Sequence, residues 1–239
     1  MPLDINGNII NATIASILPY KSITTRGLVL YIDSVSPDCY PGSGTSIYDL
    51  SGQGNTGTLV NGATVSGGSI NFVGSSTQYI NVPHSTSLNL STSFSVGCWV
   101  YYQSGSGRII QKDDRGVGDG YTRLWELGGY GGVMRIEIWH SDGNTVSIYG
   151  SALTVNGWMH LAYIFDGSSV ILYQNGSSTN STSFPGDVRT ATTPITIGGG
   201  YSTSEWFTGY ITGAYVYNRP LGASEVLQNY NAQKSRFGL

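Results

Sequence analysis

The chain has 239 residues, of which 34 are glycine and only 10% are charged. This length suits one large domain, and so few charges argue against long surface helices, whose wet faces need Glu, Lys and Arg. The formal net charge is −3 and no run of Lys or Arg occurs, so we expect neither nucleic acid nor a membrane as a partner.

The first 26 residues differ in composition from the rest, and Tyr20 is their only aromatic residue. They have no basic stretch before an apolar run, so we expect no signal peptide, and no segment of about 18 apolar residues could span a bilayer. We predict an N-terminal arm over residues 1–26 and one domain over residues 27–239. Cys39 and Cys98 are predicted to be free thiols.

From residue 27 onward, short runs alternate apolar or aromatic residues with polar ones, and turn residues such as Gly, Asn-Gly or Asp-Gly close each run. These patterns predict strands joined by tight turns, in antiparallel sheets. Only residues 221–234 have apolar residues at helical spacing, which predicts one short C-terminal helix. The predicted strands are 27–33, 69–73, 78–83, 94–102, 108–112, 133–140, 145–150, 158–166, 170–174, 194–198 and 206–218.

Residues 52–57 read Gly-Gln-Gly-Asn-Thr-Gly, which matches the G-x-G-x-x-G fingerprint of dinucleotide-binding loops. That loop works because a helix follows it and its N-terminus faces the phosphates. Here a short β-like run, residues 58–60, follows and ends at another turn. We therefore predict no nucleotide site.

Five segments resemble, in the same order, the laminin G-like members of the concanavalin A-like lectin and glucanase domains. The resemblance implies an all-β fold, a two-sheet antiparallel jelly-roll β-sandwich with one short C-terminal helix. It also implies a concave face and rim loops that in many members bind glycans, sometimes through calcium. The segments are LVLYIDSVSPDCYPGSGTSIYDLSGQGNTGTLVNGA (28–63), INFVGSSTQYINVP (70–83), FSVGCWVYY (94–102), NGWMHLAYIFDGSSVILYQNG (156–176) and FTGYITGAYVYNRPLGASEVLQNYNA (207–232).

Glucanases of this superfamily carry the pattern E-x-D-x-x-E, and the closest match here is EIWHSD, which begins at Glu137. Trp139 replaces the middle acid, and Asp142 falls in an Asp-Gly turn, where its expected role is to bond backbone. We therefore expect Glu137 to lack a partner acid, and we predict no catalytic residues and no enzymatic activity. Glu126, Arg135 and Glu137 are expected to form a solvated charge set across neighbouring strands.

The stretch KDDRGVGDG places Asp113, Asp114 and Asp119 in one glycine-rich loop. Oxygen ligands on such a loop suit calcium, and we expect no other cofactor. The alternative is an exposed acidic loop that Lys112 and Arg115 neutralise.

Three aromatic residues, Trp125, Tyr130 and Trp139, lie close to glycine-rich turns. Flat rings at such places can stack on sugars, so we predict that these three form a weak glycan-binding site at the rim. The alternative is that they belong to the core, as expected for Trp99 and Trp158.

The C-terminal QNYNAQKSRFGL resembles laminin G-like proteins of tailed bacteriophages. This resemblance implies a non-enzymatic structural protein on the virion surface, as a head decoration, fibre or tail adhesion module. It would be made in the host cytoplasm, assemble as a homo-oligomer or in many copies, contact other virion proteins through the arm, and bind host polysaccharide. The alternatives are a glucanase-like hydrolase and a free lectin or adhesion module.

Overall fold

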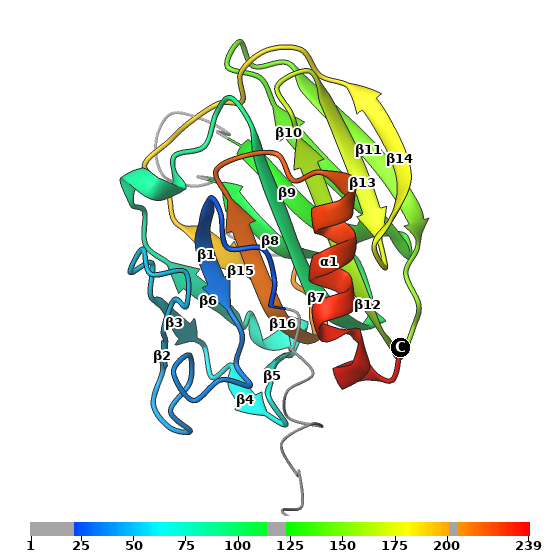
Figure 1. Cartoon of the computed structure of the whole chain (residues 1–239). Helices are drawn as coiled ribbons and strands as arrows, with labels where there is room; N and C mark the ends of the chain where they lie inside the picture. The colour runs from blue at the N-terminus through cyan, green and yellow to red at the C-terminus, as the bar shows by residue number, and fades with distance from the viewer. Residues whose placement is uncertain (1–21, 114–122, 201–204) are drawn as a thin grey trace, which may run out of the picture.

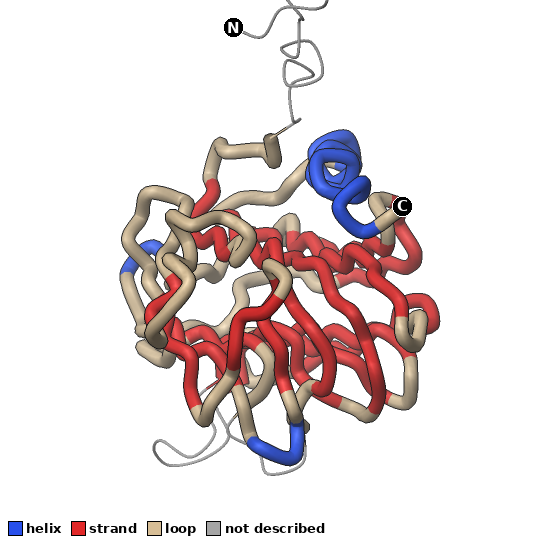
Figure 2. The backbone as a smooth tube through the Cα atoms, turned by 90° about the horizontal axis from the view of Figure 1, so that it is seen from below, coloured by secondary structure: helices blue, strands red, loops and turns tan. Residues whose placement is uncertain are grey.

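The computed structural model of the protein describes residues 22–113, 123–200 and 205–239. Within these residues, two antiparallel eight-stranded sheets pack face to face, and one α-helix, α1 (Ala223–Gln233), lies on the outer side of one sheet (Figure 1). Figure 2 shows the two layers of strands with the helix outside them. The predicted all-β jelly-roll sandwich with one short C-terminal helix is confirmed.

The helix-bearing sheet is called sheet I. Its strands, in order across the sheet, are β14 (Ser177–Ser183), β13 (Ser169–Gln174), β12 (Gly157–Phe165), β7 (Phe94–Ser104), β16 (Thr208–Tyr217), β5 (Ser69–Phe72) and β4 (Thr64–Ser66), and β1 (Leu28–Ile32) also pairs with β16. Sheet II consists of β11 (Thr145–Ala152), β10 (Val133–Trp139), β9 (Arg123–Tyr130), β8 (Gly107–Asp113), β15 (Ile195–Ile197), β6 (Tyr79–Val82), β3 (Gly57–Val60) and β2 (Ser46–Ile47). Short 3-10 helices are η1 (Gly74–Ser76), η2 (Thr86–Leu88) and η3 (Lys234–Phe237).

Each of the eleven predicted runs contains a strand, and β3 matches the short β-like run at 58–60, but β2, β4, β9 and β14 were not predicted as strands. β2 and β4 are only two and three residues long. β9 is buried at six of its eight positions, so its sequence shows no alternation. β14 has the sequence SSTNSTS, without an apolar residue, and lies at the edge of sheet I. Hydrophobic periodicity cannot reveal either kind of strand.

Alternation along the strands fills the space between the sheets with apolar side chains. On β7, for example, Val96, Cys98 and Val100 face this core and are fully buried. Both cysteines are buried and free. The segment 52–57 leads into β3 rather than into a helix, as expected.

A second apolar cluster lies between the outer side of sheet I and α1. Residues that precede β1 join it: Ile23 is 5% exposed, the backbone N–H of Thr24 donates to Asn229 Oδ1 (2.9 Å), and Tyr217 donates its hydroxyl proton to the Thr24 carbonyl (2.6 Å). Most of the predicted arm, residues 1–21, lies outside the described residues. None of the described helices is long and apolar enough to cross a membrane.

Candidate functional site

Seven charged side chains gather on the outer face of sheet II, and we call them the ionic cluster. Strand alternation places Glu126, Arg135 and Glu137 there. Register shifts in the β8–β9 pair bring Arg108, Asp113 and Arg123 to the same face, and Glu205 comes from the segment before β16. Glu126 on β9 lies directly opposite Glu137 on β10 in the strand register. The members of the cluster are Arg108, Asp113, Arg123, Glu126, Arg135, Glu137 and Glu205.

Arg108 lies at the centre of the ionic cluster and is only 1% exposed. Its Nη1 donates to Asp113 Oδ2 (2.8 Å), and its Nη2 lies 3.1 Å from Glu126 Oε2 and also donates to Glu205. A buried guanidinium is tolerated only when its charge and its hydrogen-bond donors have partners. Arg108 therefore ties two strands of sheet II to the segment that carries Glu205.

Arg135 bridges the two opposed carboxylates. It donates to Glu126 through Nη2, and its Nη1 lies 3.3 Å from Glu137 Oε1. The other oxygen of Glu137 accepts from Arg123 (3.2 Å). The expectation of a solvated charge set is wrong, because the side chain of Glu126 is 2% exposed and those of Arg135 and Glu137 are 12% exposed. The expectation that no acid faces Glu137 is also wrong, because Glu126 does.

Burial raises the pKa of Glu126 to about 7. The guanidinium groups of Arg108 and Arg135 oppose this shift, and the negative charge of Glu137 adds to it. Desolvation penalises the ionised carboxylate more than the two cations favour it. The protonation of this buried carboxyl group therefore changes close to neutral pH.

The three rings of the predicted glycan site lie in different environments. Trp125 points into the core, 0% exposed, with its ring centroid 5.7 Å from that of Phe94, so it offers no surface to a sugar and that part of the prediction is wrong. The reason is the strand register: Glu126, its neighbour, takes the outer face. Tyr130 is 50% exposed, and the Arg135 guanidinium lies 4.9 Å from its ring centroid. Trp139 is 9% exposed beside Arg123 (5.3 Å).

Tyr130 ends β9 and Trp139 ends β10, so the two rings lie at opposite ends of an antiparallel strand pair with the ionic cluster between them. Tyr149 on β11 is a third ring on this face, which the sequence analysis missed. It is 45% exposed and lies directly across from Arg135 in the register. The alternation of Tyr149 with the apolar Ile148 could have indicated that Tyr149 points outward. It could not have indicated that Tyr149 lies beside Arg135.

Sequence analysis also missed Arg108 and Glu205, whose pairing joins residues 97 positions apart. The segment around Glu205 reaches the face because the glycines before it leave room: a Cβ on Gly199 would lie 2.1 Å from the ring of Trp206. The glycine run 198–200 was the available sign that another part of the chain approaches closely.

The space beside Tyr130 and Arg108 is shallow, with a volume of about 10 Å³. That is no more than one water molecule occupies. Beside these described residues a ligand would therefore lie across the surface rather than in a pocket.

Of the three predicted calcium ligands, only Asp113 lies within the described residues. Asp113 is 3% exposed and its carboxylate pairs with Arg108. Asp114 and Asp119 lie outside the described residues. Among the residues that are described, no three His, Cys, Asp or Glu side chains are grouped so that they could hold a metal ion. Calcium binding stays a prediction.

A family model described as the concanavalin A-like lectin/glucanases superfamily, with laminin G-like domains, matches residues 73–227. This match covers more than half of the chain. The comparison with curated proteins found no match.

Solved structures share the fold at low identity. The binding domain of Paraclostridial Mosquitocidal Protein 1 has a TM-score of 0.69 at 20% identity, over 87% of this chain and 52% of that one. The ligand binding domain of botulinum neurotoxin serotype D, solved with N-acetylneuraminic acid, has a TM-score of 0.69 at 13% identity, over 87% and 52%. Domain 4 of AbnA, a GH43 extracellular arabinanase from Geobacillus stearothermophilus solved with arabinotriose, has a TM-score of 0.61 at 19% identity, over 85% and 98%. This chain thus spans about half the length of the two toxin domains.

Proposed function

We propose that this chain, which belongs to the concanavalin A-like lectin/glucanases superfamily, is a non-catalytic carbohydrate-binding module. The observation that carries the proposal is the outer face of sheet II, where Tyr130 and Tyr149 are about half exposed on either side of Arg135. Two solved domains of the same fold, one with arabinotriose and one with N-acetylneuraminic acid, support a saccharide as the ligand.

The chemistry of this face suits a saccharide. A tyrosine ring offers an apolar face to the C–H groups of a sugar, and guanidinium and carboxylate groups bond its hydroxyls. The guanidinium of Arg135 lies over one side of the Tyr130 ring and holds the ring in place, while Tyr130 stays 50% exposed to a ligand. Because the described space beside Tyr130 and Arg108 is shallow, binding there is weak, and it becomes effective when many copies share one surface.

A second candidate function, glycoside hydrolysis, has one observation in its favour. Glu126 has a raised pKa and faces Glu137, and retaining glycosidases use two opposed carboxyl groups of which one is kept protonated. Against it, both carboxyl groups are bound by arginines, and the side chain of Glu126 is 2% exposed, so a glycosidic oxygen has no path to it. We therefore favour binding without hydrolysis.

The test compares Tyr130→Ala and Tyr149→Ala with Tyr48→Ala, a control tyrosine that is 46% exposed on another part of the surface. On a glycan array with multivalent protein, each of the first two variants should lose roughly tenfold in affinity, the usual loss for one aromatic anchor, while Tyr48→Ala binds as wild type. Equal binding by all four proteins would overturn the site. Release of reducing sugar by the wild type, abolished in Glu126→Gln, would establish the hydrolase instead.

The finer proposal is that the module is displayed in many copies on a phage virion, fastened through residues 1–26. It is supported by the C-terminal resemblance and by the contacts that bind Thr24 to β16 and α1. Mass spectrometry of purified particles should find the protein in a fixed ratio to the major structural proteins. Protein that lacks residues 1–21 should fold and fail to incorporate, and normal incorporation would refute the role of the arm.

A further inference from the structure

We propose a second saccharide-binding surface on the outer face of sheet I, formed by a row of three rings and an adjoining hollow, with a neutral linear polysaccharide as its ligand. The rings are Trp158 on β12, Tyr101 on β7 and Tyr210 on β16. The strand register sets them directly opposite one another, Trp158 to Tyr101 and Tyr101 to Tyr210. Each ring centroid lies 5.7 Å from that of the next ring, and neighbouring rings meet edge to face, at 64° and 75°, so the row presents ring faces and ring edges in turn. The surface is independent of the site on sheet II.

Alternation turns this row away from the core, because the neighbours Val100, Met159 and Ile211 are buried between the sheets. The next outer residues along β7 and β12, Trp99 and His160, are 0% exposed under the C-terminal helices. The three rings of the row are only half-buried, so the expectation that Trp158 belongs to the core is wrong. The C-terminal helices thus cover one part of the aromatic face and leave the row accessible.

The row continues in polar residues. Asn71 on β5 lies opposite Tyr210, and Thr64 on β4 lies opposite Asn71. The row therefore presents rings, an amide and a hydroxyl, and none of its five residues is charged. Rings stack on the C–H faces of sugars and the amide bonds their hydroxyls, whereas an ionic ligand would find no counter-charge in the row.

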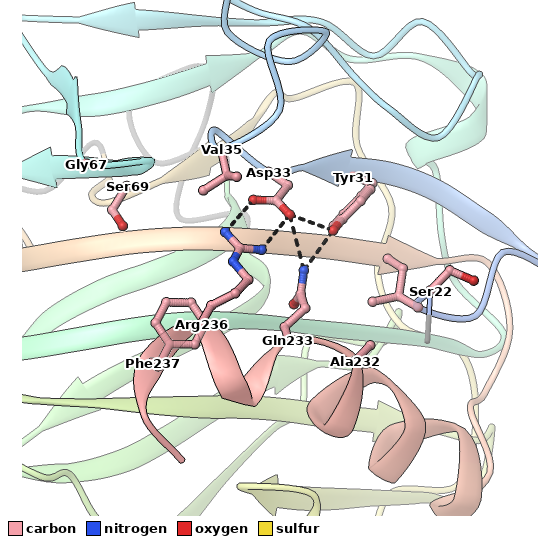
Figure 3. A pocket seen from close by; sticks show the side chains of 11 residues that line it. Ser22, Tyr31, Asp33, Val35, Gly67, Ser69, Ala232, Gln233, Arg236 and Phe237 are labelled. Carbon is pink, nitrogen blue, oxygen red and sulfur yellow. Dashed lines mark hydrogen bonds and ion pairs between the residues drawn. The ribbon is translucent and has the colours of Figure 1, made fainter. Parts of the chain in front are cut away.

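A hollow of about 590 Å³ adjoins this row, with Asp33, Ser69, Gln233, Arg236 and Phe237 in its wall (Figure 3). That volume lies within the range of small-molecule sites. Arg236 donates to both oxygens of Asp33 (2.7 and 2.9 Å), so the charges of the pair cancel. Gln233 donates to Tyr31 (2.8 Å), which holds its amide in place.

Phe237 joins the hollow to the row. Its ring lines the hollow, and its centroid lies 4.5 Å from that of Trp158. Ser69 lies on the same strand as Asn71, two residues away, so both point to the outer face. The ligand of this combined surface would place one sugar in the hollow and the following sugars across the rings.

A second copy of the chain is the other occupant to consider. Stable protein interfaces use about 20–30 residues on each side, with an apolar centre and a polar rim. The row offers three rings beside a hollow of ligand size, which fits a sugar chain better than a flat protein surface.

The test is affinity electrophoresis of the full chain in native gels that contain hydroxyethyl cellulose, a neutral polymer, or alginate, an anionic one. Wild-type protein should be retarded by the neutral polymer. Tyr210→Ala and Trp158→Ala should each weaken this binding roughly tenfold, the loss expected for one aromatic anchor. Tyr210→Phe keeps the ring and should bind as wild type, which assigns the binding to the ring rather than to the hydroxyl, and a urea midpoint of Tyr210→Ala like that of the wild type separates lost stacking from lost folding.

Tyr130→Ala serves as the control from sheet II and should leave the retardation by the neutral polymer unchanged. If Tyr130→Ala abolishes it and Tyr210→Ala does not, the second surface is refuted while the proposed function stands. If the neutral polymer retards nothing, or if Tyr210→Ala turns a dimer into a monomer in sedimentation, the row does not bind saccharide and the inference is overturned.

Discussion

The outer faces of the two sheets carry different kinds of side chain. Both face away from the core at alternate strand positions. On sheet I these positions hold aromatic and aliphatic residues, which α1 and η3 partly cover, as Tyr230 and Phe237 stack on Trp99. On sheet II they hold the ionic cluster and three rings near it. A sheet face with a helix over it can thus be apolar, whereas the face of sheet II holds largely buried charges that are stabilised by pairing with charges of opposite sign.

Substitutions on the two faces should also change the free energy of unfolding in different ways. A buried ring contributes in proportion to the apolar area it removes from water, so its loss is graded. A buried ion pair contributes little net stability, yet removing one partner leaves an uncompensated charge. Variants on sheet II should therefore have effects that depend on which partner is removed, and those on sheet I should depend on volume.

The largest effect is predicted for Arg108→Ala. This change leaves three carboxylates, those of Asp113, Glu126 and Glu205, without their shared cation. We expect the free energy of unfolding to fall by about 3–5 kcal/mol, the cost of breaking a buried pair from one side. Urea denaturation followed by tryptophan fluorescence measures it.

Arg123→Ala is the matched control, because Arg123 also pairs with a glutamate but its side chain is 28% exposed. Its loss should cost less than about 1 kcal/mol, as for surface pairs. Equal costs for Arg108→Ala and Arg123→Ala would show that the ionic cluster does not depend on a buried centre.

The second prediction concerns His160, a buried histidine of sheet I that lies under the C-terminal helix. It is 0% exposed, its Nε2 lies 2.8 Å from the Tyr215 hydroxyl, and burial lowers its pKa to about 3. The unfolded chain takes up a proton near pH 6.5, whereas the folded chain does not until far lower pH. Its contribution is therefore complete above pH 6.5 and lost as the pH falls, by about 1.4 kcal/mol per pH unit.

Glu126 opposes this effect over the same range, because its raised pKa of about 7 makes the folded chain take up a proton before the unfolded chain does. Urea denaturation between pH 4.5 and 7 should therefore show a slope in the wild type that differs from that of His160→Gln by about 1.4 kcal/mol per pH unit. His84→Gln is the comparison with a partly exposed histidine; because desolvation and the nearby Lys112 lower the pKa of His84 as well, this variant should remove a smaller part of the slope. If the slope of the wild type persists in His160→Gln, the acid sensitivity arises from other groups.

How far these faces could be predicted from the sequence depends on the range of the contacts. The period of two predicted eleven of the sixteen described strands and the helical spacing predicted α1, because those patterns are local. Trp125 and Tyr130 look alike as rings near glycines, but the register of β9 buries one and exposes the other. Arg108 and Glu205 meet through tertiary structure alone, which no local pattern encodes.

The third prediction tests how the helix is held on sheet I. The Tyr217 hydroxyl donates to the Thr24 carbonyl (2.6 Å) and accepts from the amide of Asn229 (3.1 Å). Tyr217→Phe removes only this hydroxyl and should cost about 1–2 kcal/mol, because two buried partners lose a hydrogen bond. Hydrogen exchange should show faster opening of α1.

Tyr40→Phe, whose hydroxyl makes only an exposed, long bond of 3.4 Å, is the control and should leave stability unchanged. An unchanged α1 in Tyr217→Phe would mean that apolar contacts alone hold the helix.

The smallest effect on stability is predicted for the removal of calcium. Its removal should instead change saccharide binding, and on one of the two faces only. If Asp113, Asp114 and Asp119 hold the ion, chelation should weaken saccharide binding on sheet II and leave retardation by neutral polymer on sheet I unchanged. The melting temperature should hardly move, because the pairing of Asp113 with Arg108 neutralises that carboxylate without any metal.

Isothermal titration of the EDTA-treated chain with calcium measures binding of the ion directly, and titration with magnesium is the control. Asp119→Asn should remove the calcium signal without disturbing the Arg108 pair. Calcium binding that survives this variant, or unfolding on chelation, would show that the three aspartates are not the ligands.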